Sequence, residues 1–438
     1  MYVGKNYITE NRTKSRHRFE SLMMLITGMF SCTNVVSAFV VGSTSIAWMN
    51  VLTVLFLFFC IVLNKGKLKN VIHYFTRDLL FTGFFIFLSV VQVILFNPNN
   101  LYQWAVGCVA VALNGLIIVF ILEEKEYKNL LYSGLIIGIA INFAVSIYAM
   151  VLYNRGVILD LASYFPNTSG ISRMYLSNSF RARGLFKEQG HLMRYIAIIA
   201  LPVIAFAKKS NRILYYCTVG MVIFLAAFSG SSALAIFLLG VAVYIILVNG
   251  KTAWRMFGFL ILIICGVSLV LVLGRNIPFF QRLTVAFRIG VLSIFDTESA
   301  NADRLQGMKY AIEIIKEYPI IGCGWNQFTK IFMDKGFYGD QIFGSYSAGL
   351  SLIAEIGFAS LCYFFFCVKK AFELIRSRMD EESIAVGVSL LIYLLLFFTT
   401  DFSFDSGSST FIALSLIVYT DTKDNINNLE NEGSNDYN

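Results

Sequence analysis

Long apolar runs separated by short polar stretches dominate the chain of 438 residues. A membrane-spanning helix needs roughly 20 apolar residues, and several runs reach or approach that length. The runs lie near 21–41, 44–63, 79–96, 103–122, 130–153, 191–207, 213–229, 231–248, 256–273, 347–368, 384–399 and 407–420. The pattern predicts an all-α polytopic membrane protein with about 12 transmembrane helices, because each backbone polar group in lipid must be satisfied within its own segment.

Basic residues sort the connections between these runs into two sets. Alternate connections all carry Lys or Arg, whereas the short ones at 42–43, 97–102, 230 and 400–406 carry none. Cytoplasmic connections are enriched in Lys and Arg, so we expect both termini to be cytoplasmic. We therefore expect a single integral membrane domain over 1–420, and a disordered cytoplasmic tail over 421–438, which is rich in Asn and acidic residues.

Two large extracytoplasmic loops, 154–190 and 274–346, break the charge rule. Long loops escape that rule, so their charge is free to serve another purpose, and loops of this length are usually functional. The first loop carries Arg155, Arg173, Arg181, Arg183 and Lys187. The second loop carries Arg275, Arg282, Arg288, Arg304, Lys309, Lys316, Lys330 and Lys335.

Composition narrows the classes of function. Hydrophobic residues make up 57% of the chain and charged residues only 14%, against about a quarter charged in soluble domains. The net charge is +8, but the basic residues are spread between the apolar runs rather than gathered in one patch. This distribution does not suggest a nucleic-acid binder. No nucleotide-binding loop, hydrolase elbow, zinc-binding motif or CxxC motif is present, and we expect no metal and no cofactor.

A first group of charged residues precedes the sixth apolar run. Residues 180–191 read FRARGLFKEQGH and place three cations, one acid and one imidazole close together in the sequence, among them Arg181, Arg183, Glu188 and His191. Arginine forks suit phosphate oxygens through paired hydrogen bonds, and a carboxylate beside a histidine can move a proton. The alternative is an interfacial anchor whose cations contact lipid phosphates.

A second group opens a helical pattern in the second loop. Arg304 and Lys309 begin a run to about Tyr318, which Pro319 and the sequence Gly-Cys-Gly at 322–324 end. Its apolar face is expected to consist of Leu305, Met308, Ile312 and Ile315. Arg304 is expected in the first turn, where the helix dipole disfavours a cation, so it needs an anionic ligand or a surface salt bridge with Asp303.

A third group enters the tenth apolar run. Tyr346 and Ser347 precede that run, and Glu355 is almost the only ionisable group well inside an apolar run. Buried carboxylates in membranes are costly and usually functional. The alternative is a hydrogen bond that packs two helices together.

The order of runs and loops resembles the superfamily of O-antigen polymerases and O-antigen ligases. The segment from Arg181 to Glu188 is similar to the motif R-x-x-G-L-F-x-E of Wzy-type polymerases, although Gln189 stands where they usually have proline. Arg304 followed by Ile315, Pro319, Gly322 and Gly324 resembles the Arg-led helix of the family, and Leu350, Glu355 and Gly357 resemble the stretch after it. Ligase members usually have a His-Asn-like pair where this chain has Tyr346 and Ser347, which favours the polymerase branch.

The resemblance implies a metal-independent, GT-C-like membrane glycosyltransferase that polymerises polyprenyl-pyrophosphate-linked oligosaccharides into O-antigen, capsule or exopolysaccharide. It implies a bacterial cytoplasmic membrane as location, the lipid-linked oligosaccharide as donor and acceptor, and a chain-length regulator as partner. The implied catalytic residues are Arg181, Glu188 and Arg304, and the implied substrate-binding residues are Arg183, His191, Lys309, Tyr346 and Glu355.

Three alternatives to a polymerase stay open on the sequence. A ligase that moves the finished glycan to another acceptor would share the spans and arginines. A transporter or flippase of lipid-linked sugars would place ionisable groups near the middle of the membrane, whereas here they crowd into two outer loops. A structural or regulatory membrane protein is the third.

Overall fold

The computed structural model describes part of the chain in atomic detail. It covers residues 18–33, 37–41, 44–47, 51–52, 54–55, 58, 126–159, 180–186, 188–231, 233–249, 300–324, 327–337, 345–377, 380–399 and 410–422. The predicted spans at 79–96, 103–122 and 256–273 lie outside these residues. The same holds for most of span 44–63 and for the tail after 422.

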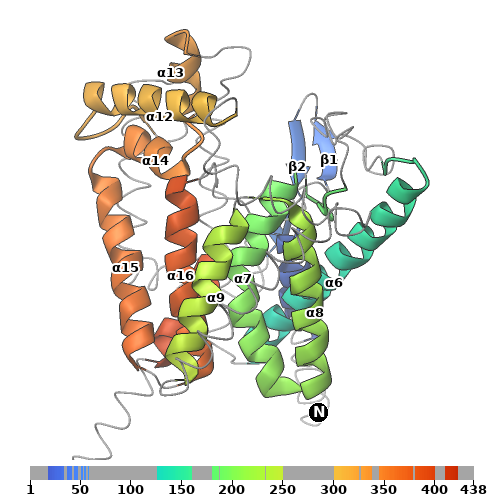
Figure 1. Cartoon of the computed structure of the whole chain (residues 1–438). Coiled ribbons are helices and arrows are strands. Elements are labelled where there is room, and N and C mark those ends of the chain that lie inside the picture. Colours follow the sequence, from blue (N-terminus) through green and yellow to red (C-terminus); the bar gives the residue numbers. More distant parts are fainter. Residues whose placement is uncertain are drawn as a thin grey trace, which may run out of the picture.

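A bundle of apolar helices forms the body of the described structure (Figure 1). Four of them are long and apolar enough to cross a membrane: α6 (Glu126–Asn154), α7 (Gln189–Ser210), α8 (Arg212–Ser229) and α16 (Glu381–Thr399). Two shorter apolar helices, α9 (Ala233–Asn249) and Thr410–Thr422, accompany them. The prediction of a polytopic helical membrane protein is confirmed to this extent. Gly230, in the left-handed conformation, ends α8 shortly before α9 begins.

The first predicted span, 21–41, is wrong in its second half. A helix covers residues 18–31, and an antiparallel hairpin of β1 (Ser37–Val41) and β2 (Thr44–Ala47) follows it. Val40, Val41 and Thr44 are β-branched and Gly42 lies between the strands, a composition that favours strands and a turn over helix. Among the residues that the structure describes, the all-α expectation therefore holds apart from this hairpin.

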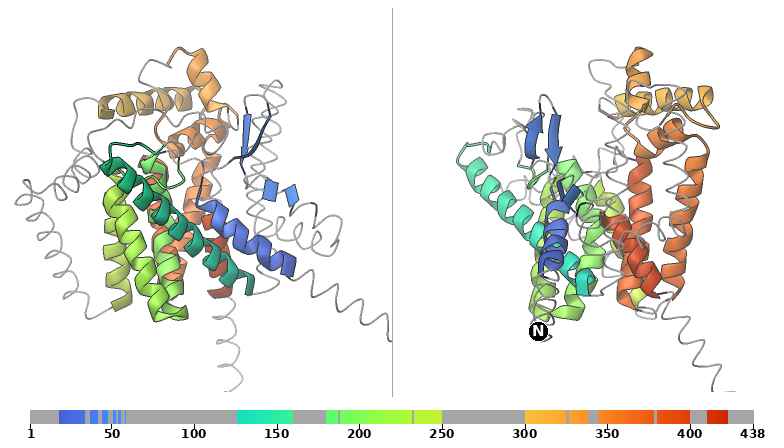
Figure 2. Two further views of the ribbon diagram at one scale, coloured as in Figure 1. Left: turned by 90° about the vertical axis from the view of Figure 1, so that its right-hand side faces the viewer. Right: turned by 180° about the vertical axis from the view of Figure 1, so that it is seen from behind.

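Small residues let the helix at 18–31 approach α6 closely, and Figure 2 shows the two side by side. A β-carbon on Gly28 would lie 2.4 Å from the Leu131 carbonyl oxygen, and one on Gly134 would lie 2.2 Å from that of Leu25. Close backbone approach at glycines is the usual way in which helices associate in lipid.

The predicted span 347–368 is also wrong, because the helix breaks within it. A short helix, α14 (Ala348–Ile356), ends at Gly357, whose φ of 71° is left-handed. A second helix, α15 (Ala359–Ser377), then runs alongside α16. Above α14, the second loop adds α12 (Ala300–Glu317) and α13 (Phe328–Asp334), with α12 lying across the end of the bundle (Figure 1).

The two ends of the bundle are chemically distinct. Lys208 at the end of α7 binds Glu381 at the start of α16 with a separation of 2.8 Å between Nζ and Oε2, so α7 and α16 run antiparallel. We call this the Lys208 end. The start of α7, the end of α16 and α14 share the opposite end, which we call the loop end; there Ser347 Oγ donates to the Phe398 carbonyl oxygen at 2.8 Å.

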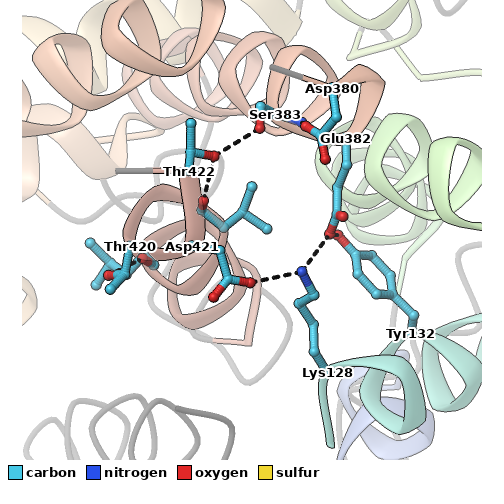
Figure 3. A network of polar contacts seen from close by, with 10 residues as sticks. Lys128, Tyr132, Asp380, Glu382, Ser383, Thr420, Asp421 and Thr422 are labelled. Carbon is cyan, nitrogen blue, oxygen red and sulfur yellow. Dashed lines mark hydrogen bonds and ion pairs between the residues drawn. The ribbon is translucent and has the colours of Figure 1, made fainter. Parts of the chain in front are cut away.

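An ionic network ties helices together at the Lys208 end (Figure 3). Lys128 Nζ lies 2.9 Å from Asp421 Oδ2 and 3.5 Å from Glu382 Oε1, and the Tyr132 hydroxyl donates to the same Glu382 oxygen at 2.8 Å. The network joins α6, α16 and the helix Thr410–Thr422. The predicted disordered tail therefore begins too early, because Asp421 and Thr422 belong to this helix.

Candidate functional site at the loop end

The turn at 180–186, which carries Arg181 and Arg183, is fixed to two helices and to Thr33, which follows the helix 18–31. The Ala182 N–H donates to the Phe228 carbonyl oxygen of α8 at 2.7 Å. The Leu185 N–H donates to Asn142 Oδ1 of α6 at 2.7 Å, and the Leu185 carbonyl accepts from Thr33 Oγ1 at 2.9 Å. The backbone of this arginine-bearing segment is therefore a defined part of the bundle.

Asn142 is the central anchor of this turn, and sequence reasoning missed it. Its amide is buried, and Nδ2 donates to the carbonyl oxygens of Cys32 and Gly138, both at 2.8 Å. Gly184 has a left-handed φ of 53°, and a β-carbon there would lie 2.1 Å from Asn142 Oδ1. Glycine in the motif is thus required by close packing as well as by conformation. The sequence signal that could have indicated Asn142 is a polar amide side chain inside a predicted span.

The predicted catalytic and binding residues of the first group lie together around the start of α7. Arg181 and Arg183 are half-buried, and Arg183 Nη2 donates to the Leu159 carbonyl oxygen at 2.8 Å. Glu188 is exposed at the N-cap of α7, and its carboxylate makes no hydrogen bond to the helix N–H groups. His191 lies one turn further along α7 and is half-buried.

Arg194 adds a further cation to this group that the sequence analysis did not single out. It lies on α7, half-buried, inside the predicted span 191–207. A β-carbon on Gly190 would lie 3.5 Å from Arg194 Nη2 and 4.0 Å from Ser231 Oγ, so the guanidinium lies over Gly190 near the α8–α9 hairpin. A cation within an apolar span was the signal for it.

The second and third predicted groups meet at the turn that follows α12. The N–H groups of Cys323 and Gly324 donate to the carbonyl oxygens of Ala354 and Glu355 at 2.8 and 2.9 Å. Glu355 Oε1 accepts from the Phe328 N–H at 3.3 Å, at the start of α13. Burial, with the Glu355 carboxylate nearby, raises the pKa of the Cys323 thiol. Glu355 therefore lies near the end of the short helix α14, beside the second loop, and bonds to the loop backbone.

Tyr346 and Lys309, from the third and second predicted groups, have different surroundings. Tyr346 is half-buried and has a left-handed φ of 54°, an uncommon conformation for a residue with a side chain. Ser347 beside it caps α14 by accepting from the Leu350 N–H at 3.2 Å. Lys309 is exposed on α12.

The expected apolar face of α12 is partly wrong. Its buried side contains Gly307, Ala311 and Ile314, whereas Ile312 is exposed. The helix begins at Ala300, so Arg304 lies beyond the first turn and the expected dipole penalty is smaller. The Arg304 side chain lies outside the described part of the structure.

The loop end thus brings together two sets of predicted residues. Arg181, Arg183, Glu188 and His191 surround the start of α7, and Tyr346 and Glu355 flank α14 at the same end of the bundle. Among the residues that the structure describes, no group of three or more His, Cys, Asp or Glu side chains is arranged to hold a metal ion. Guanidinium groups beside an accessible carboxylate can hold a phosphate-bearing ligand and move a proton.

Fold and site define a polytopic helical membrane protein with a cationic site at one end of its bundle. Residues 214–365 match the family model described as O-antigen ligase, and this match supports the resemblance to the superfamily of O-antigen ligases and polymerases. The matched residues include most of α8, all of α9, and Tyr346 and Glu355, which lie just before α14 and near its end. They exclude the turn at 180–186. No curated protein sequence matches the chain.

Proposed function

We propose that the chain is a bacterial inner-membrane glycosyltransferase that polymerises polyprenyl-pyrophosphate-linked oligosaccharide repeat units at the outer face of that membrane. The observation that carries the proposal is the turn at 180–186, whose backbone is bonded to α6 and α8 and which carries two half-buried arginines shortly before the exposed Glu188. The family match of residues 214–365 supports glycan assembly as the area of function.

The proposed reaction transfers the growing glycan from its lipid to a new unit. A hydroxyl oxygen of the acceptor sugar attacks the anomeric carbon of the donor, and the bond from that carbon to the pyrophosphate oxygen breaks. The polyprenyl pyrophosphate leaves with the bonding electrons, and Glu188 takes the hydroxyl proton. Arg181, Arg183 and Arg304 neutralise the charge that develops on the leaving phosphate, so the reaction needs no metal.

The remaining predicted residues bind and orient the substrates in this proposal. His191 and Lys309 contact sugar or phosphate oxygens, and Tyr346 and Glu355 orient a sugar or an arginine. Both termini are cytoplasmic, which places the loop end outside, and a chain-length regulator acts as partner. The whole of 1–420 acts as one membrane domain.

Ligase-type transfer is the second candidate, because the matched family model is described as O-antigen ligase. In that reaction the donor is the finished lipid-linked glycan, and the acceptor is another molecule in place of a new repeat unit. Tyr346 and Ser347 stand where ligases of the family usually have a His-Asn-like pair, and the Ser347 hydroxyl is engaged in capping α14 and in bonding Phe398. This local structure favours the polymerase.

The test is a polymerisation assay in a host that supplies the cognate lipid-linked repeat unit. Wild type is compared with Arg181→Ala, Arg304→Ala and the control Arg155→Ala at matched expression in membranes. Arg155 is an exposed arginine of the same outer loop, so it controls for loss of positive charge. The length distribution of the glycan is read on a gel.

Collapse of the ladder to single repeats in the first two variants, with a normal ladder in Arg155→Ala, supports a polymerase built on these arginines. Full-length polymer in both variants overturns the site. Loss of even the single repeat on its final acceptor indicates ligase or flippase activity instead.

A further inference from the structure

The turn between α12 and α13 is locked to the junction of α14 and α15. The Phe358 N–H donates to the Pro319 carbonyl oxygen at 3.1 Å, in addition to the two bonds from Cys323 and Gly324. A β-carbon on Gly357 would lie 2.2 Å from the Ile320 carbonyl oxygen, and one on Gly322 would lie 2.2 Å from the Glu355 carbonyl carbon. This close interlock fixes the position of Ile320 relative to α15.

Large apolar side chains are exposed on this locked turn. Ile320 is 75% exposed, Ile321 is 49% exposed and Phe358 is 55% exposed. A solvent-facing loop would gain nothing from presenting these side chains to water, since burial of apolar area is favourable. Contiguous exposed apolar side chains usually mark a contact with a partner or a membrane.

The same stripe continues along α15. Phe365 and Phe372 are 72% and 59% exposed and follow Phe358 at intervals of seven residues. Seven residues are close to two helical turns, so the two phenylalanines lie on one face of α15. That helix lies lengthwise beside the candidate span α16 (Figure 1), a position that suits contact of its exposed phenylalanines with lipid.

We propose that the turn Pro319–Ile321, with Phe358, inserts into the outer-leaflet interface of the membrane and anchors the α12–α13 segment to the lipid surface. The choice of lipid as the occupant follows from position: Phe358 directly precedes α15, seven residues before the exposed Phe365, and Ile320 packs against the same junction through its carbonyl oxygen. Exposed Lys316 and Glu317 flank the apolar tip, the arrangement of an apolar wedge with polar edges at a membrane interface. The proposal does not depend on the glycan chemistry proposed above.

The test is photo-crosslinking of the full-length protein in lipid nanodiscs. The photoreactive residue p-benzoylphenylalanine replaces Ile320 or Phe358, one position per variant, and lipid adducts are counted by mass spectrometry. Replacement at Phe358 is close to isosteric and guards against misfolding at Ile320. Phe365 serves as the lipid-facing reference. Met333 serves as the control, because it is 48% exposed on α13 of the same loop and Figure 1 shows α13 further from the bundle.

Lipid adducts at Ile320 and Phe358 are expected at a yield comparable to Phe365 and about tenfold or more above Met333, because acyl chains do not extend beyond the interfacial region. Yields as low as at Met333 overturn the proposal. Cross-links at Ile320 or Phe358 to protein, whether a second copy or another membrane protein, in place of lipid also overturn it.

Discussion

Asn142 Oδ1 accepts a hydrogen bond from the Leu185 N–H at 2.7 Å, which joins the middle of α6 to the arginine-bearing turn 43 residues later in the chain. The same amide holds the Cys32 carbonyl at the end of the helix 18–31. One buried side chain therefore sets the position of Arg183 and Gly184 relative to two helices. Positioning of the proposed catalytic arginines is consequently a property of the bundle core.

Replacement of Asn142 by leucine should destabilise the protein and disturb the turn. The change keeps the branched shape of the side chain but leaves the Leu185 N–H and the Cys32 carbonyl without their buried partner, at about 1–3 kcal/mol for each group. Thermal unfolding in detergent and the glycan ladder measure the two effects. Asn249→Leu is the control, because Asn249 is exposed and its amide bonds only within α9. Equal unfolding temperatures for the two variants would contradict this anchoring role.

Gly184→Ala and Gly156→Ala form a matched pair of substitutions. Both glycines have a left-handed φ, of 53° and 76°, but a β-carbon at Gly156 meets nothing within 4 Å, whereas one at Gly184 meets Asn142. Gly156→Ala should cost only the conformational penalty of about 1–2 kcal/mol. Gly184→Ala should cost clearly more and should shorten the glycan ladder, because the turn must move. If both variants unfold at the same temperature, the close approach of Gly184 to Asn142 does not contribute to stability.

The sequence predicts the elements whose bounds follow from local hydrophobicity, and it misses the features that depend on contacts between distant segments. Hydrophobic period and length locate α6 to α9 and α16 within a few residues, because lipid thickness fixes their length. The break at Gly357 was missed, since the apolar run continues through it while tertiary bonds to Pro319 and Cys323 decide the local conformation. Asn142 and Arg194 were missed for a related reason: they lie inside apolar runs, and their roles arise from contacts with distant segments.

Two substitutions of Glu355 separate its structural role from its proposed chemical role. Glu355→Gln keeps an oxygen that can accept from the Phe328 N–H, so the fold should be retained. Glu355→Ala removes that acceptor at the start of α13 and should cost about 0.5–2 kcal/mol, as loss of a helix cap does. Limited proteolysis of the α12–α13 segment measures the structural effect. If the negative charge orients an arginine or a sugar, Gln should also abolish long polymer while the segment stays protected.

A full ladder in Glu355→Gln, with faster proteolysis only in Glu355→Ala, would assign the residue a structural role alone.

Lys128→Met should destabilise the Lys208 end. Lys128 and its partners Glu382 and Asp421 are 16%, 11% and 21% exposed at their side chains, so removal of the cation leaves two poorly solvated carboxylates facing each other. Breaking such a pair costs about 3–5 kcal/mol when it is fully buried, and this value is an upper bound here. Lys369→Met is the control, because Lys369 is 73% exposed and lies 3.8 Å from Glu373, a surface pair worth about 0–1 kcal/mol.

The double variant Lys128→Met with Asp421→Asn should recover part of the loss, since one uncompensated charge is removed. Thermal unfolding at matched pH measures all three proteins. A double variant less stable than Lys128→Met would argue against charge repulsion as the cause.

The raised pKa of the Cys323 thiol predicts slow, pH-dependent alkylation. An exposed cysteine titrates near about 8.5, whereas burial and the Glu355 carboxylate keep Cys323 protonated to higher pH. A cysteine introduced as Asp334→Cys, at an exposed position of α13, should react at pH 8 while Cys323 stays unmodified, as peptide mass spectrometry can measure. Glu355→Gln should speed the reaction of Cys323 only modestly, because burial is the larger cause. The raised pKa also makes stability depend on pH. Above about pH 8.5 the thiol of the unfolded chain loses its proton, whereas the thiol of the folded protein keeps it. The unfolded state then binds fewer protons, so the free energy of unfolding should fall as pH rises. Labelling of Cys323 as fast as Asp334→Cys at pH 8 would show that the turn opens in solution and is not locked to α14.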